Sequence, residues 1–221
     1  MNWYLIGALT LGTVLMFSVM LICNRAYGFR VGKIAATALL LTFAGVLSVK
    51  LMYFIENGSF SGQSFFGAIF FVPLLFVPIT LLLRLPYRSV LDLCAPSICI
   101  MLAIMKLECL RSGCCIGKFL YFNADGKGVR FPSRELELAA ALIIMAVLIM
   151  LIRKGKLGGK IYPVFMIVYG IARFILNWFR ETTPFIFGLP AGNFWSIISV
   201  IAGAIWLISL ERSRQKKEIA S

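Results

Sequence analysis

The chain has 221 residues, of which 61% are hydrophobic and 14% charged, and its mean hydropathy is +0.93. So few polar residues cannot cover a water-soluble globule of this length, which excludes a soluble enzyme and indicates an integral membrane protein. The formal net charge of +13 lies mostly in short segments between apolar runs. Membrane orientation and anionic lipid account for such a pattern, so no nucleic-acid partner is expected.

Seven apolar runs are long enough to cross a bilayer, which takes roughly 20 residues. They lie at about residues 3–23, 34–55, 65–85, 89–110, 133–152, 160–180 and 193–210. The segments between them are short, and the longest, 111–132, contains turn-forming residues that predict a loop. The expected fold is therefore an all-α polytopic membrane protein with about seven transmembrane helices, forming a single integral membrane domain over residues 1–221.

The distribution of Lys and Arg predicts the orientation, because cytoplasmic segments of membrane proteins carry an excess of both. Thirteen of the 22 basic residues lie after the first, third and fifth runs and in the tail, whereas six lie in the segments on the other side. The N-terminus is therefore expected outside and the C-terminus in the cytoplasm. The other three, Lys50, Lys106 and Arg173, lie near the outer ends of apolar runs, so we expect them in one leaflet.

The stretch from Lys106 to Lys118 carries the most informative residues. Lys106 and Glu108 follow apolar neighbours, and ionisable groups at such a depth indicate function by default. Glu108 is expected to pair with Lys106 or Arg111. Three cysteines and two glycines then favour a tight turn back toward the membrane: Cys109, Cys114, Cys115, Gly113 and Gly117. We expect this turn to form one wall of a site for an anionic lipid head group.

Polar residues recur along the sixth apolar run at intervals of four, four and three: Tyr169, Arg173, Asn177 and Arg180. This spacing places them on one helical face. Arg180 alone would be interpreted as a side chain that reaches up to the membrane surface. A stripe of four is not expected on a lipid-facing surface, so it predicts a functional role for Arg173.

Two further segments allow a structural interpretation. Asp92 near the start of the fourth run is expected to interact with the dipole of its own helix at the cytoplasmic surface. The small polar segment 58–64 lies on the outer side, either as a re-entrant element or as a simple loop.

The six cysteines permit several interpretations. Cys23, Cys94 and Cys99 are expected to pack as small apolar residues. The other three, in the turn after the fourth run, allow a disulfide from Cys109 to one of the adjacent pair, or a functional thiol. The chain has no histidine and no paired CxxC units, so neither a mixed Cys/His zinc site nor structural zinc is expected.

Five motifs occur along the chain. They are Ser64-Phe65-Phe66-Gly67, Asp92 with Ala95-Pro96, Lys106 through Gly113 and Gly117, Pro132-Ser133-Arg134-Glu135-Leu136-Glu137, and Tyr169-Gly170-Ile171-Ala172-Arg173-Phe174 with Arg180. In this order, and over nearly the whole chain, they resemble the prolipoprotein diacylglyceryl transferase family of bacterial inner membranes. That family reads Ser-Phe-His-Gly, Asp with Ala-Pro, Arg-x-Gly-Asn-x-x-Asn-Gly-Glu, Pro-Ser-Gln-Leu-Tyr-Glu and Tyr-Gly-x-x-Arg at the corresponding places.

The chain departs from these motifs at several positions. Phe66 stands where the family has an imidazole, and Lys106 stands in place of the signature Arg. Lys106 keeps the charge but loses the planar fork that holds phosphate through two bonds. The remaining differences are Cys109 and Ser112 for Asn, Cys114 for an acid, Leu136 for Tyr and Asn177 for Glu. They indicate a divergent member or a paralogue.

The resemblance implies a transferase that moves the diacylglyceryl group of phosphatidylglycerol, or of another anionic glycerophospholipid, to the lipobox cysteine of a preprolipoprotein signal peptide. It implies a multi-pass protein of the bacterial cytoplasmic (inner) membrane, without a cofactor or a metal. The catalytic residues would be Arg173, Tyr169 and Lys106. The substrate-binding residues would be Arg180, Arg111, Ser112, Gly113, Cys109, Cys114, Asn177 and Ser64.

Two other functions stay open at this point. One is a paralogue that modifies a different acceptor, and the other is a membrane protein that binds lipid without catalysis. A transporter is disfavoured, because the seven runs show no inverted repeat and the intramembrane charges gather in one leaflet.

Overall fold

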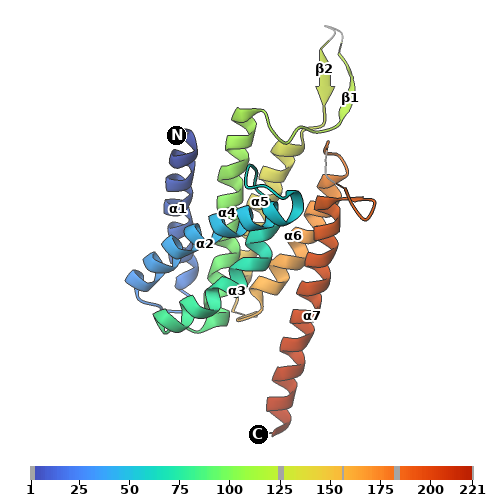
Figure 1. Cartoon of the computed structure of the whole chain (residues 1–221). Coiled ribbons are helices and arrows are strands. Elements are labelled where there is room, and N and C mark those ends of the chain that lie inside the picture. The colour runs from blue at the N-terminus through green and yellow to red at the C-terminus, as the bar shows by residue number, and fades with distance from the viewer. Residues whose placement is uncertain (1–2, 124–126, 156, 182–184, 221) are drawn as a thin grey trace.

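The computed structural model describes residues 3–123, 127–155, 157–181 and 185–220. Within these residues the chain forms seven α-helices, which confirms the all-α polytopic class (Figure 1). They are α1 (Trp3–Asn24), α2 (Val31–Asn57), α3 (Phe66–Leu83), α4 (Tyr87–Ser112), α5 (Ser133–Arg153), α6 (Ile161–Asn177) and α7 (Ala191–Ala220).

Of the seven described helices, all except α6 are long and apolar enough to cross a membrane. Helix α6 is apolar but has only 17 residues. The predicted run 160–180 therefore extends past the end of its helix. After Asn177 the backbone pairs with the segment that follows α4: the N–H of Lys118 donates to Phe179 and that of Glu181 to Ile116. These bonds take the place of further helical turns.

The central helix of the bundle is α4, which packs against α1, α3, α5 and α6. Its membrane-spanning window is 78% buried, whereas no other span exceeds 44%. Helices α6 and α7 also pack closely. A Cβ at Gly170 would lie 3.0 Å from the Ser196 carbonyl oxygen and 2.8 Å from a Val200 methyl, so only glycine permits this approach.

Asp92 was expected to interact with the dipole of its own helix. In the structure its backbone partners lie instead at the start of α6. It is buried in the second turn of α4 and accepts hydrogen bonds from the backbone N–H groups of Gly159 and Ile161 and from the Tyr27 hydroxyl. The first N–H groups of a helix have no partner within it. Asp92 thus caps α6 and joins three segments at the end of the bundle opposite the α4–α5 connection.

The connections at the other end are more structured than the sequence predicts. The expected loop 111–132 contains a hairpin of β1 (Phe119–Phe122) and β2 (Gly128–Arg130), and β3 (Phe185–Ile186) pairs with β4 (Leu189–Pro190) before α7. The connection 58–65 is irregular. It is tied back to α2 by hydrogen bonds from Lys50 to the Phe60 carbonyl and from Ser64 to Glu56.

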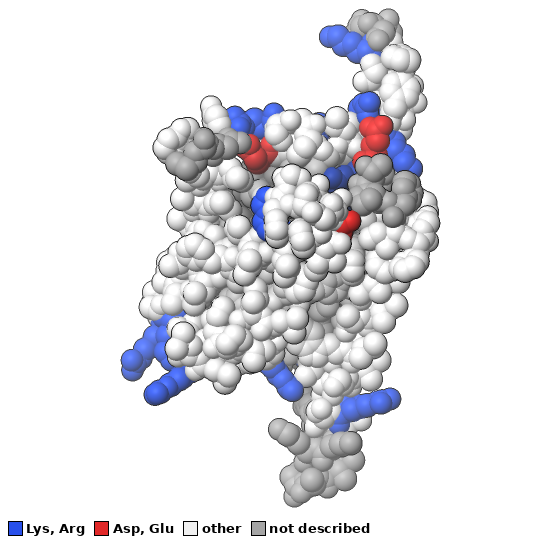
Figure 2. Space-filling view, in the orientation of Figure 1, with Lys and Arg blue, Asp and Glu red and all other residues white. Residues whose placement is uncertain are grey.

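The two termini lie at opposite ends of the bundle (Figure 1). On the face shown in Figure 2, Lys and Arg gather toward these two ends, and the belt between them carries few charged side chains. This distribution agrees with a bundle that spans the bilayer. Which end faces the cytoplasm stays a prediction from the sequence.

Candidate functional site

A pocket of about 490 Å³ lies between α1, α2, α4, α6 and the connection 58–65. One part of its wall is apolar and includes Leu9, Met16, Leu41, Val46, Met101 and Met105. The other part is polar and includes Lys50, Glu56, Ser64, Lys106, Tyr169, Arg173, Asn177 and Arg180. The pocket is therefore amphipathic, with charged groups gathered on one side of an apolar space.

The polar wall is built around Glu137 of α5, whose side chain is only 5% exposed. Its Oε2 pairs with Nζ of Lys106 on α4, and its Oε1 pairs with Nη1 of Arg173 on α6. Nη1 of Arg180 lies 3.8 Å from the same Oε1. One carboxylate thus holds three cations from separate parts of the chain.

This cluster carries an excess of positive charge. Lys106, Arg173 and Arg180 supply three charges and Glu137 neutralises one, which leaves two. The buried Nε of Arg180 has no hydrogen-bond partner in the described part of the chain. A buried donor and uncompensated cations in a low-dielectric environment favour an anion in the pocket.

The spacing of the sixth apolar run predicted part of this arrangement correctly. Tyr169, Arg173, Asn177 and Arg180 all line the pocket, although Arg180 lies three residues beyond the end of α6. The ring of Tyr169 contacts Phe65 and Phe66, with centroids 5.1 and 6.0 Å away. Phe66, where the family's motif has an imidazole, is therefore part of an aromatic wall beside the cations.

Seven of the eleven candidate residues line the pocket: Arg173, Tyr169, Lys106, Arg180, Cys109, Asn177 and Ser64. The other four, Arg111, Ser112, Gly113 and Cys114, lie outside its described lining and are exposed. They fall at the end of α4, where Gly113 adopts a left-handed conformation with φ +72° and ends the helix.

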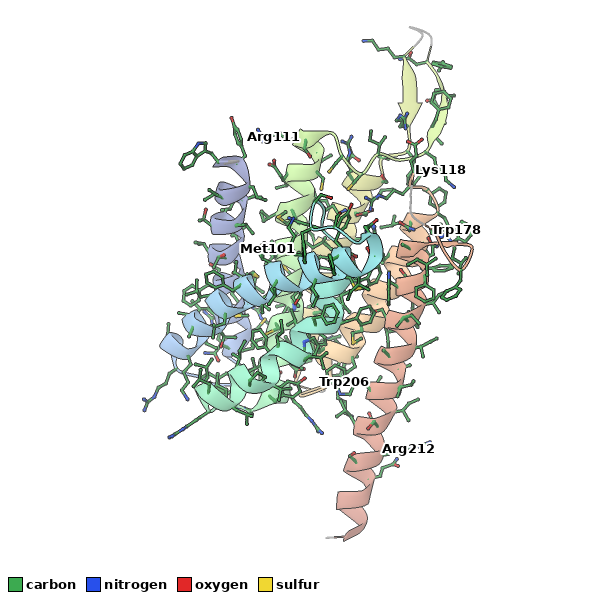
Figure 3. All side chains as sticks on the ribbon, viewed as in Figure 1. Met101, Arg111, Lys118, Trp178, Trp206 and Arg212 are labelled. Carbon is green, nitrogen blue, oxygen red and sulfur yellow. The ribbon has the colours of Figure 1, made fainter. Side chains whose placement is uncertain are left out.

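Arg111 is held at the rim of the bundle (Figure 3). Its Nη2 lies 3.1 Å from Oε1 of Glu108, and its guanidinium stacks 3.5 Å above the ring of Tyr4. Of the two partners expected for Glu108, Arg111 is therefore confirmed. The other predicted partner, Lys106, does not pair with Glu108, because its ion pair is with Glu137.

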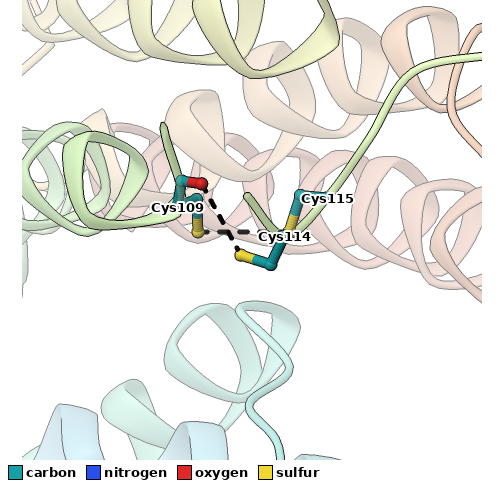
Figure 4. A group of neighbouring side chains, drawn as sticks. All are labelled: Cys109, Cys114 and Cys115. Carbon is teal, nitrogen blue, oxygen red and sulfur yellow. Dashed lines mark hydrogen bonds between the residues drawn. The ribbon is translucent and has the colours of Figure 1, made fainter. Parts of the chain in front are cut away.

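Three thiols gather at the end of α4 and the start of the α4–α5 connection (Figure 4). The Sγ atoms of Cys109 and Cys115 are 4.0 Å apart, and all six cysteines are free, so the disulfide considered from the sequence is not formed. Hydrogen bonding to Cys109, aided by the charges of Lys106 and Arg180, lowers the pKa of the Cys115 thiol below its ordinary value.

The other three cysteines are buried among apolar side chains, as the sequence predicted: Cys23, Cys94 and Cys99.

The sequence analysis did not identify several residues at or behind the polar wall. Glu137 was recognised only as the last residue of a motif, Glu56 was not a candidate, and Cys115 was considered only as one of three thiols in the turn. Lys50 was noted only as a base inside an apolar run. The acid in Pro132-Ser133-Arg134-Glu135-Leu136-Glu137 was the available signal, because a carboxylate inside a transmembrane helix needs a partner.

The fold and the pocket define a polytopic membrane protein with a buried three-cation cluster beside an apolar cavity. The chain belongs to the prolipoprotein diacylglyceryl transferase family, whose family model matches residues 1–209.

Curated relatives carry the name phosphatidylglycerol–prolipoprotein diacylglyceryl transferase. The protein of Idiomarina loihiensis is 30% identical over 105 residues, which are 45% of this chain and 38% of the relative. That of Polaromonas naphthalenivorans is 29% identical over 136 residues, 55% of this chain and 50% of the relative. That of Clostridium tetani is 23% identical over 146 residues, 58% of this chain and 55% of the relative. The matched segment thus spans about half the length of these relatives or less.

Proposed function

We propose that this protein transfers the diacylglyceryl group of phosphatidylglycerol, or of another anionic glycerophospholipid, to the lipobox cysteine of a preprolipoprotein in the bacterial inner membrane. The observation that carries the proposal is the cluster of Lys106, Arg173 and Arg180 around Glu137, at one side of an apolar pocket. Such a pocket suits an anionic amphiphile, with its phosphate at the cations and its acyl chains against α1, α2 and α4.

The charge of the cluster fits the reaction as well as the substrate. The donor lipid is a phosphodiester with one negative charge, and the departing glycerol phosphate is a monoester with nearly two near neutral pH. A cluster with more cations than carboxylates therefore interacts more strongly as the C–O bond breaks. Interactions that strengthen toward the transition state accelerate the reaction.

The polar side chains at the pocket then have different roles in binding the lipid and the peptide. Arg173, anchored by Glu137, presents a guanidinium to the phosphate, and Arg180 adds its unpaired Nε–H. Lys106 supplies a point charge. Tyr169, Asn177, Cys109 and Ser64 contact the head group or the incoming peptide. We assign Arg111, Ser112, Gly113 and Cys114 to the exposed rim, where the signal peptide enters.

A second candidate is a membrane protein that binds phospholipid without catalysis. The observation that favours it is Phe66, which is 4% exposed and packed against Tyr169 where the family's motif has an imidazole. With no histidine in the chain, this position offers no base for the acceptor thiol. Transfer to a different thiol acceptor is a variant of the first proposal and requires the same cluster.

An electrophoretic-shift assay tests the proposal. The full chain, phosphatidylglycerol and a lipobox peptide are incubated together, with Arg173→Ala in parallel and Arg212→Ala as the matched control on the exposed part of α7 (Figure 3). We expect the protein without substitution and the Arg212→Ala variant to produce a slower-migrating, thioether-linked peptide. Arg173→Ala should lose roughly 10²–10³-fold in rate, the loss typical for removal of one transition-state donor.

The protein without substitution could also bind the lipid and form no product. That result would contradict transfer to a lipobox cysteine and favour the non-catalytic candidate.

A further inference from the structure

A short segment at the end of α4 brings three sulfur atoms together. Cys109, Cys114 and Cys115 each offer a thiol, and their Sγ atoms all lie within 4.8 Å of one another. Cys115 has φ +61°, in the left-handed region that residues with a side chain rarely adopt. This backbone conformation and the turn at Gly113 fold the chain back, so that Cys109 and Cys115 both face the pocket.

The spacing of the sulfur atoms matches a metal-bound set of thiolates. Zinc binds thiolate sulfur at about 2.3 Å in a tetrahedral arrangement, which sets neighbouring sulfur atoms about 3.8 Å apart. The 4.0 Å between the Sγ atoms of Cys109 and Cys115 is close to that value. Every pair of Sγ atoms lies within 4.8 Å, so the sulfur atoms must move closer by an ångström or less to close around an ion.

We propose that Cys109, Cys114 and Cys115 bind one zinc ion through three thiolates and leave its fourth coordination position open at the pocket. Three protein ligands with one open position are the pattern of catalytic rather than structural zinc sites. The inference departs from the expectation of no metal, which rested on the absence of histidine and of paired CxxC units. The folded turn, rather than the sequence spacing, brings the ligands together.

The surrounding charges suit this assignment. Three thiolates and one Zn²⁺ ion carry a net charge of −1, and Lys106 and Arg180 line the same pocket as Cys109 and Cys115. Cations beside the site stabilise the anionic complex and the deprotonated ligands that the metal requires. The same two cations belong to the cluster around Glu137, so the zinc site and the phosphate-binding groups share one wall.

The zinc site deepens the proposed function, and this part of the inference rests on it. The lipobox thiol takes the fourth coordination position and releases its proton to water, so that it is bound as a thiolate. Its sulfur then attacks the glyceryl carbon of the donor lipid. The C–S bond forms, the C–O bond breaks, and glycerol phosphate leaves with the bonding electron pair. A metal-bound thiolate of this kind needs no imidazole as a base.

Cobalt substitution tests metal binding without any lipid. The reduced full chain in detergent is titrated with Co²⁺, and the thiolate-to-metal charge-transfer and visible d–d bands are recorded, followed by displacement with Zn²⁺. We expect one ion per chain in a tetrahedral thiolate site. The side chain of Cys114 is exposed, so Cys114→Ser should not disturb the core, and we expect it to weaken Co²⁺ binding at least tenfold. The triple variant Cys109→Ser/Cys114→Ser/Cys115→Ser should show no bands.

Cys99→Ala is the matched control, because Cys99 is buried in the same helix away from the cluster. It should leave the bands unchanged. No charge-transfer band in the reduced protein, or equal bands in the triple variant, would overturn the zinc site.

A transfer assay then separates the two proposals. Removal of zinc by a chelator should reduce peptide modification at least tenfold, with recovery on addition of Zn²⁺. Modification that persists unchanged after zinc removal would overturn thiol activation and leave the transferase standing. Cobalt bands without any modification by the zinc-loaded protein would keep the metal site and contradict the transferase.

Discussion

Glu137 is the residue on which the geometry of the pocket depends. It is a buried carboxylate in contact with Lys106 and Arg173 and close to Arg180. Removal of one partner from a buried ion pair leaves the others uncompensated, which costs about 3–5 kcal/mol. A carboxylate inside an apolar helix signals that Glu137 has a partner, but its partners lie on two other helices, so the sequence alone could not say which residues they are.

We therefore expect Glu137→Gln to lower the free energy of unfolding by about 3 kcal/mol and to abolish transfer. Denaturant unfolding in detergent measures the first effect. Glu135→Gln is the matched control, because Glu135 is exposed two residues earlier in the same helix. Equal stability of the two variants would show that the ion cluster does not hold the helices together.

Lys106 permits a test of charge against geometry. Lys106→Met removes the charge and keeps the length of the side chain, and we expect the transfer rate to fall by roughly 10²-fold. Lys106→Arg keeps the charge and adds a planar fork for phosphate, so its rate should stay within about tenfold of the original. Initial rates of peptide modification compare the two. A larger loss in Lys106→Arg than in Lys106→Met would contradict an electrostatic role.

At the scale of elements, the sequence predicted the helices well because long apolar runs leave few alternatives. It failed where pairing between distant segments decides the structure. The β1–β2 hairpin lies in a connection that was expected to be a loop, and α6 ends early because residues 179 and 181 pair with residues 116–118. Asp92 was assigned to its own helix because its partners at the start of α6 are 67 and 69 residues away.

The close contact of α6 and α7 gives a prediction at this scale. Gly170→Ala places a Cβ against the Ser196 backbone and Val200, so we expect a destabilisation of about 1–3 kcal/mol from overpacking. Gly7→Ala in α1 is the matched control, because nothing lies within 4 Å of its added Cβ. Thermal unfolding in detergent measures both. Similar unfolding temperatures for the two variants would contradict the close packing.

At the scale of the whole molecule, the charge distribution predicts the orientation. The C-terminus should be cytoplasmic and the β1–β2 hairpin should lie outside, because the basic excess is on the side of the C-terminus. Alkaline phosphatase is active only outside the cytoplasm. We expect a fusion truncated after Lys127 to be active and a fusion after Ser221 to be inactive. The opposite pattern would reverse the predicted topology.

The most direct test of the central claim, that the cation cluster stabilises a departing phosphate, is the identity of the small product. Phosphatidylglycerol with an isotopically labelled head group is incubated with the protein and a lipobox peptide, and both products are counted by mass spectrometry. We predict one labelled glycerol phosphate for each diacylglyceryl-modified peptide. Peptide modified by a fatty acyl group, with lysophospholipid in place of glycerol phosphate, would contradict the account.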